Sequence, residues 1–584
     1  MKKQMSKLAL AGFFSACLAM AQTPILPLRD VKAGMKGIGR TVFSGDRIEE
    51  FQADILGVLE NSGPRQSIIL ARLSGGPIAK TGVMQGMSGS PVYVDGKLIG
   101  AVALAFTFAT DPIAGIRPIE EMLDVTQSTA TPARREVALR AGGDPSASKL
   151  VELATPVSFS GLSEASVARF APELRKLGLE PMQGALAGGG GSNNATPGDR
   201  TKIKPGSMIS VQLMTGDMAV AADGTVTMID GDKLYAFGHR FLSGGATEMP
   251  FARSEVIALL PNINTSFKIS TAREHMGVIT QDRNAAIAGS FGGRPTMVPL
   301  AITVRGSDRS KPARSYNMQM VRDKTLLPLL TQMAIFSSID GTERTLGPGT
   351  MRLRGTLEFD GGMPPIRLDN AFASDTNAPA LAAAYTSLPI SYALLSGIDT
   401  LKPKSISIEI EATDSKKSFQ LDQAWVSARE ARAGESVEIN LSLTGENGAE
   451  LFRKVNFPLP IGMSPGPLYF TISDGMTSNF SELLQTASTR SRTPGQVAEL
   501  LNSLRPNDRM TIRVWRAEPA YAVPGAEIPD PPASVGLVLA RLQTSGALAN
   551  NSARGAKIAE MEVDLNGSIG SGSKTLQVEV KEPQ

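Results

Sequence analysis

A short segment of the chain, Gly86-Met87-Ser88-Gly89-Ser90-Pro91, has the residue types that present a serine nucleophile. The two glycines allow a tight turn close to a substrate carbonyl, and the amides of Gly86 and Ser88 could converge as an oxyanion hole. Residues 92–102 alternate around Asp95-Gly96, which predicts a two-stranded hairpin behind the turn. The segment therefore indicates hydrolytic chemistry at Ser88. The alternative is a turn between strands that serves only backbone geometry.

A hydrolytic serine needs a base, and the chain contains only two histidines, His239 and His275. His239 follows an alternating run and a turn at residues 224–232, so we expect it at the end of a hairpin strand, facing a cleft. His275 lies among charged residues beside a predicted turn and is expected on the surface. The sequence therefore favours His239 as the base. The alternative is a strand-end histidine that bonds only to backbone.

Several motifs, in one order, resemble the SpoIVB-type serine peptidases. Residues 28–39, 51–58 and 81–102 are similar to the nucleophile-bearing half of that family. Gly224-Thr225-Val226-Thr227, followed by Phe237-Gly238-His239, is similar to its histidine-bearing half, where a hairpin runs into a Gly-His pair. In the family the histidine half comes first, whereas here Ser88 precedes His239. The resemblance therefore implies a two-lobed peptidase with permuted lobes.

The resemblance also implies an acidic third member shortly before the nucleophile, yet residues 71–76 contain no carboxylate. The group that orients His239 must then come from elsewhere. Asp282 is the best candidate, because it follows a strand-like run in the same lobe as the histidine. Glu248 is a second choice. The alternative for Asp282 is a salt bridge to Arg283 or a turn cap.

The first 21 residues have the pattern of a secretory signal peptide, with three lysines before an apolar run that ends in Ala19-Met20-Ala21. We expect cleavage after Ala21 and a mature protein in the periplasm, the cell envelope or the medium. Cys17 is the only cysteine, but Phe14 is a poor lipobox residue, so a lipid anchor is not favoured. No later apolar run reaches the roughly 18 to 20 residues of a membrane span, so we expect no transmembrane segment in the mature chain.

The composition of the chain limits the classes of binding partner that we expect. A net charge of +3 argues against nucleic acid, and 5% aromatic residues argue against base stacking. Without a mature cysteine and with two histidines, no metal site is expected, and nothing suggests a cofactor. The expected partner is a protein or peptide substrate, which could be the chain itself.

The predicted fold class is mainly β: a two-lobed, chymotrypsin-like β-barrel peptidase unit with permuted lobes, followed by a β-sandwich-like C-terminal region. Alternating runs such as 406–410 and 437–443 support the sandwich, which could bind an envelope protein. A helix is expected around 162–177. The expected units are a signal peptide (1–21), a Ser-bearing lobe (22–125), a helical and flexible linker (126–200), a His-bearing lobe (201–305), a mixed region (306–402) and a β-rich C-terminal part (403–584).

Together these observations predict an exported serine endopeptidase that forms an acyl-enzyme. Ser88 would attack, His239 would take and return the proton, Asp282 would orient the histidine, and the amides of Gly86 and Ser88 would hold the oxyanion. Two alternatives remain open. One is a non-catalytic cell-envelope scaffold that keeps the peptidase fold, and the other is an esterase that uses the same residues.

Overall fold

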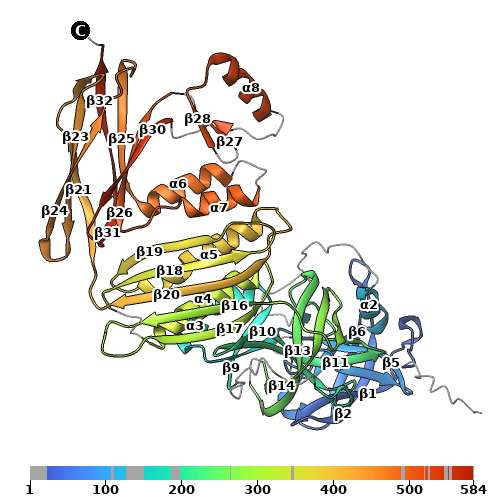
Figure 1. The fold of residues 1–584 in the computed structure, drawn as a ribbon. Coiled ribbons are helices and arrows are strands. Elements are labelled where there is room, and N and C mark those ends of the chain that lie inside the picture. The colour runs from blue at the N-terminus through green and yellow to red at the C-terminus, as the bar shows by residue number, and fades with distance from the viewer. Residues whose placement is uncertain are drawn as a thin grey trace, which may run out of the picture.

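The computed structural model describes residues 23–106, 109, 111–126, 150–185, 198–262, 265–342, 347–487, 493–518, 520–523, 526–544, 550–551 and 555–582. The predicted signal peptide with Cys17, and the glycine-rich stretch 188–194, lie outside these residues. Figure 1 shows two β units at one end of the molecule, a layer of sheet and helices in the middle, and a β region at the C-terminal end.

The first β unit, here called the Ser barrel, is a closed ring of antiparallel strands. The strands pair in the order β4-β1-β2-β3-β6-β5, and β5 closes the ring by pairing with β4. Phe51, Ile69 and Val102 are among the residues of its apolar core. Its elements are β1 (Lys36–Ser44), β2 (Arg47–Gly63), β3 (Gln66–Ser74), α1 (Ile78–Thr81), β4 (Pro91–Val94), β5 (Lys97–Phe106), β6 (Ile113–Pro118), α2 (Ile119–Leu123) and the edge strand β7 (Leu150–Glu152).

The second β unit, here called the His barrel, closes in the same way. Its strands pair in the order β10-β13-β14-β15-β12-β11, and β11 returns to pair with β10. Two isolated bridges, Gly45 to Val256 and Gln85 to Phe267, join the two barrels. The strands are β10 (Met208–Gly216), β11 (Ala219–Asp230), β12 (Lys233–Ala236), β13 (Gly245–Leu260), β14 (Phe267–Arg283) and β15 (Ala286–Phe291).

The two closed barrels confirm the predicted fold class of the peptidase unit. Within the expected helical and flexible linker (126–200), residues 150–185 contain strands as well as the expected helix. β8 (Thr155–Ser160) pairs with β11, and β9 (Leu179–Ala185) pairs with β8. The expected helix is α3 (Glu164–Lys176), which begins where the Ser163 hydroxyl accepts a hydrogen bond from the Ser166 amide.

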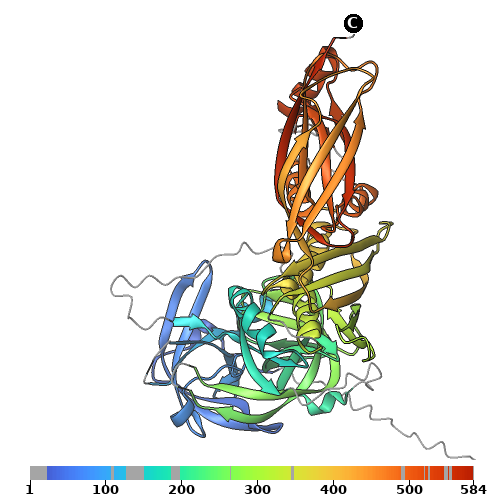
Figure 2. The ribbon, with the colours of Figure 1, turned by 90° about the vertical axis from the view of Figure 1, so that its left-hand side faces the viewer.

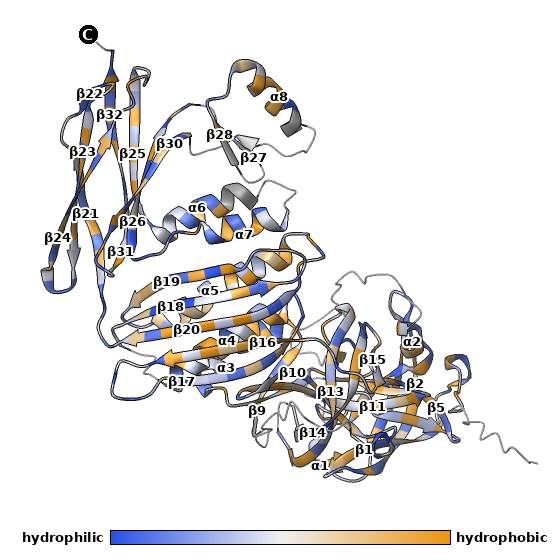
Figure 3. Ribbon diagram, viewed as in Figure 1, coloured by the Kyte–Doolittle hydropathy of each residue, from blue (hydrophilic) through white to orange (hydrophobic). Residues whose placement is uncertain are grey.

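The middle layer continues the sheet of the His barrel instead of forming a separate unit. Strand β17 pairs with β10, so one sheet runs from the barrel out to β19. Hydrophobic and hydrophilic residues alternate along its outer strands, as Figure 3 shows. The elements are β16 (Met297–Arg305), β17 (Arg314–Val321), α4 (Leu326–Asp340), β18 (Gly349–Phe359), β19 (Ile366–Ser374), α5 (Ala378–Leu395) and β20 (Pro403–Thr413).

Helix α5 departs from the expectation that no later apolar run reaches the length of a membrane span. It has 18 residues and a mean hydropathy of 1.2, which meets that test by length and composition. However, 61% of the helix is buried in the structure, and it packs on α4, β18 and β19. Its apolar character is therefore that of a core helix.

The C-terminal region is a sandwich of two sheets, as predicted. The sheets share a core that includes Leu441, Phe470 and Ile512. Figure 2, in which the view is turned by 90°, shows that the sandwich extends away from the barrels. Its strands are β21 (Ser418–Val426), β22 (Glu430–Arg432), β23 (Ser436–Gly445), β24 (Glu450–Pro458), β25 (Gly466–Asp474), β26 (Arg509–Arg516), β30 (Ala556–Asp564), β31 (Ile569–Ser571) and β32 (Ser573–Lys581); beside it lie α6 (Gly475–Ala487), α7 (Pro494–Asn502), β27 (Ala520–Val523), β28 (Ala526–Pro529), α8 (Ala533–Thr544) and β29 (Asn550–Asn551).

Candidate active site

The Ser88 turn connects α1 to β4 in the Ser barrel. The Ser90 amide donates to the Met87 carbonyl at 2.9 Å, which closes a turn with Ser88 and Gly89 at its centre. Gly89 has a φ of +91° and Gly86 a φ of +89°, both in the region that side chains disfavour. Local glycine chemistry therefore shapes this turn as the sequence predicts.

Three carbonyls of the turn are bound by strand β11 of the His barrel. The Thr225 amide donates to Ser88 O at 2.9 Å, and its hydroxyl donates to Gly86 O at 2.8 Å. The Thr227 hydroxyl donates to Gly89 O at 2.7 Å. Sequence analysis did not assign these threonines a role. Their spacing of two in a strand, which places both hydroxyls on one face, was the available signal.

The amides of the turn divide into two kinds. Met87 N donates to Met84 O, and Gly89 N donates to Val102 O. The amides of Gly86 and Ser88 donate no hydrogen bond to any other described residue, although both residues are buried. A buried amide without an acceptor costs folding free energy. The amides of Gly86 and Ser88, with Met87 between them, fit the two donors of an oxyanion hole.

His239 follows β12 after two residues in the left-handed region, Phe237 with a φ of +73° and Gly238 with a φ of +70°. Its ring is 2% exposed, and Nδ1 lies 2.7 Å from the carbonyl of Arg240. Because a carbonyl only accepts, Nδ1 carries the proton and Nε2 of the neutral ring is an acceptor. Burial lowers the pKa of His239, against the opposing effect of the Glu152 carboxylate. The ring is therefore neutral, as a general base requires.

The Ser88 turn and the His239 segment meet at Val102. Gly89 N donates to Val102 O at 2.8 Å, and a Cβ placed on Gly238 would lie 3.2 Å from the same oxygen. Even so, no hydrogen bond joins the two reactive groups. Ser88 Oγ and His239 Nε2 are both buried, and within the described part of the chain each lacks a hydrogen-bonding partner.

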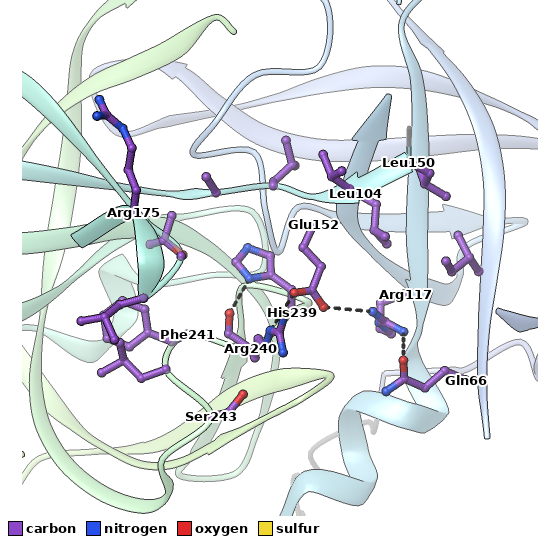
Figure 4. Close-up of a pocket in the computed structure, with 18 of the residues that line it drawn as sticks. Gln66, Leu104, Arg117, Leu150, Glu152, Arg175, His239, Arg240, Phe241 and Ser243 are labelled. Atoms are coloured by element: carbon purple, nitrogen blue, oxygen red, sulfur yellow. Dashed lines mark hydrogen bonds and ion pairs between the residues drawn. The ribbon is translucent and has the colours of Figure 1, made fainter. Parts of the chain in front are cut away.

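A pocket of about 840 Å³ opens beside the histidine. Its lining includes His239 and Arg240 from the His barrel, and Arg117 and Glu152 from the Ser barrel; Ser88 is not part of the lining. Figure 4 shows Glu152 between His239 and Arg117. Its carboxylate accepts from Arg240 Nε at 2.9 Å and lies 3.7 Å from Arg117 Nη2. Glu152 is therefore a carboxylate near the histidine, in a segment that sequence analysis had placed in the linker.

The prediction that Asp282 orients the His239 ring is wrong in this structure. The Nδ1 atom of the ring is hydrogen-bonded to the Arg240 carbonyl instead. Its Oδ1 accepts from the Phe241 amide at 2.9 Å, and its Oδ2 accepts from the Leu242 and Gly244 amides at 2.6 and 3.1 Å. Burial raises the pKa of this carboxyl. Asp282 therefore fixes the loop that follows the histidine, which is closer to the turn-cap alternative.

Two other carboxylates, Glu248 and Asp223, accept hydrogen bonds from groups other than His239. Glu248, the second choice for orienting the histidine, accepts from the exposed Thr296 amide at 3.0 Å. Asp223 is fully buried in the His barrel and accepts from the hydroxyls of Ser158 and Ser210. Burial raises the pKa of Asp223 to about 6. Neither carboxylate is hydrogen-bonded to His239 in this structure.

Residues 13–123 match the family model described as SpoIVB peptidase S55. This segment belongs to the SpoIVB peptidase family. The family is one of serine peptidases, so the match supports a serine peptidase of the SpoIVB type, as the resemblance implied. Peptidases of this type are generally exported or secreted. The match ends with α2, so the His barrel and the permuted order lie beyond it. A search of curated proteins found no similar sequence.

The contact between Gly89 and β11 predicts a strong effect of Gly89→Ala. The new Cβ would lie 2.0 Å from Thr225 O and 2.5 Å from Phe237 N, both backbone atoms. We expect the free energy of unfolding to fall by about 3 kcal/mol or more. Gly96→Ala is the matched control, since Gly96 has a φ of +76° but nothing within 4 Å, and it should lose only about 1 kcal/mol. Equal losses in denaturant unfolding would contradict the docking.

Asp282→Asn tests the role of Asp282 in the loop. The asparagine side chain cannot accept on both sides, so at least one of the amides of Phe241, Leu242 and Gly244 loses its acceptor. We expect a loss of about 1–3 kcal/mol and faster hydrogen exchange at these amides. Asp308→Asn is the control, because Asp308 accepts from the amide and the hydroxyl of Ser310 in an exposed turn, where asparagine can accept as well. Unchanged exchange in the loop would refute this role.

Proposed function

We propose that this protein is an exported serine endopeptidase that forms an acyl-enzyme on Ser88. One observation carries the proposal: the turn with two unpaired amides in one barrel meets the histidine-bearing segment of the other. Ser88 Oγ attacks the peptide carbonyl carbon while its proton passes to His239 Nε2. The amides of Gly86 and Ser88 stabilise the oxyanion, and the imidazolium protonates the departing amine. Water then attacks the ester while His239 takes its proton; the bond to Ser88 Oγ breaks, the acid product leaves, and the imidazolium returns the proton to Ser88 Oγ.

The catalytic step needs Ser88 Oγ and His239 Nε2 within about 2.6–3.2 Å of each other. They are not hydrogen-bonded here, so the proposal includes a local rearrangement when substrate binds. Catalytic hydrogen bonds are often long in substrate-free enzymes and tighten in the complex. The shift would be made by side chains, because the backbone of the turn is bound to β11.

Three groups would hold the histidine in place of a directly bonded acid. The Arg240 carbonyl holds the Nδ1 proton, and Asp282 fixes the loop that carries this carbonyl. Glu152 raises the pKa of His239 through its charge, which stabilises the imidazolium formed after attack. Arg117 and Arg240 in turn are ion-paired with Glu152.

A scaffold without catalysis is the second candidate. The observation that favours it is the burial of Ser88, which is 0% exposed and unbonded to His239. In that case the C-terminal sandwich would be the part that binds an envelope protein. Its exposed apolar side chains, Trp425, Phe452 and Ile461, are candidate contacts.

Labelling with a fluorophosphonate, followed by peptide mapping, separates the two candidates. We expect labelling at Ser88 that Ser88→Ala and His239→Ala each reduce by a factor on the order of 10⁴ or more. His275→Ala is the control, because among the described residues the His275 ring bonds only to the exposed Gly293 carbonyl. The rate should fall as pH drops through the His239 pKa, which lies below 6.5. A folded protein that stays unlabelled, also after proteolytic nicking, would support the scaffold.

Export is tested separately by N-terminal sequencing of the protein recovered outside the cytoplasm. The basic and apolar pattern ending at Ala21 predicts that the mature chain begins at Gln22. A mature chain beginning at Cys17 with a diacylglyceryl group would instead establish a lipoprotein. Retention of Met1 in cytoplasmic protein would contradict export.

A further inference from the structure

Lys268, in strand β14, lies directly against the Ser88 turn. Its amide donates to Gln85 O at 3.2 Å, beside the bridge that joins the two barrels. Its aliphatic stem covers Gly86, whose added Cβ would lie 3.2 Å from Lys268 Cδ. The lysine therefore packs on the glycine that supplies one of the two unpaired amides.

The amine of Lys268 is buried among uncharged groups. The residue is 2% exposed, and Nζ lies 2.7 Å from Thr41 Oγ1 and 3.6 Å from Met208 Sδ. The ring of Phe43 lies 6.0 Å away, and Gly86 contributes only backbone. Burial alone lowers the pKa of Lys268, to about 7. Lysine is almost never fully buried without a charged partner, so packing alone is a poor reason for this residue.

A hydrogen-bonded chain connects this amine to the turn. Ser90 Oγ donates to Thr41 Oγ1 at 3.0 Å, and the same oxygen lies 2.7 Å from Lys268 Nζ. When the amine is uncharged, Thr41 can accept from Ser90 and donate its own proton to the Nζ lone pair. When the amine is protonated it can only donate, and the Thr41 proton needs another acceptor. The charge of Lys268 therefore decides how Ser90, two residues after the nucleophile, is held.

We propose that Lys268 is a positioning residue that keeps the Ser88 turn in its reactive geometry, through Thr41 and Ser90, when its amine is uncharged. The proposal rests on the proposed function. It predicts a second ionisation in the reaction of Ser88, near pH 7, above the one that belongs to His239.

The test is the rate of fluorophosphonate labelling at Ser88 as a function of pH. The wild-type rate should rise through about pH 7. Lys268→Met should remove that rise and slow labelling at pH 8 by about tenfold or more. Thr41→Val, which keeps the lysine and breaks the chain, should have the same effect. Lys233→Met, at an exposed position of β12, is the control and should match the wild type.

Thermal unfolding separates positioning from a structural role. Between the folded pKa of about 7 and the unfolded value of 10.5, only the unfolded state holds the proton, so this lysine costs stability that returns as pH rises. Lys268→Met should therefore raise Tm, with a gain that shrinks as pH rises through this window. A slower variant with a lower Tm would make Lys268 structural and overturn the proposal.

Two further outcomes of the labelling experiment separate failure of the Lys268 role from failure of the proposed function. Wild-type rate and pH profile in both Lys268→Met and Thr41→Val would overturn the positioning role and leave the proposed peptidase intact. If Ser88 of the wild type is never labelled, the proposed function fails, and the role of Lys268 fails with it.

Discussion

The docking of the Ser88 turn on strand β11 is the contact on which the candidate site depends. The turn belongs to one barrel and its carbonyl acceptors are satisfied by Thr225 and Thr227 of the other. With its carbonyls bound in this way, the turn leaves two amides free for a substrate oxygen. Only glycine fits at position 89, because a Cβ there would lie 2.0 Å from the Thr225 carbonyl oxygen of β11. The two barrels therefore build the site jointly, whichever of them comes first along the chain.

Burial sets the electrostatics of the site. His239 and Lys268 both have a lowered pKa because little solvent reaches them, and both are thereby available as uncharged nitrogen acceptors near neutral pH. Glu152 acts in the opposite direction on the histidine, and it remains at the pocket between two arginines. The site thus combines desolvated bases with one ion-paired carboxylate, an arrangement typical of acid–base chemistry.

Local patterns were the most predictable part of this protein. The glycines around Ser88, the hairpin behind it and helix α3 all follow from turn, strand and helix signals within a few residues. The contacts of Asp282 and Glu152 could not be predicted in this way, because they depend on the path of the loop after His239 and on β7, far away in sequence. Lys268 was missed for the same reason, since its burial arises only when the barrels meet.

We propose above that Ser88 and His239 form one catalytic unit across the two barrels. The most direct measurement is a crystal structure of the protein after reaction with a peptidyl phosphonate. We expect a covalent bond to Ser88 Oγ, a phosphonyl oxygen bound by the amides of Gly86 and Ser88, and His239 Nε2 within about 3.2 Å of the bonded Ser88 oxygen. An adduct on another residue, or a histidine that stays out of reach of Ser88, would contradict it.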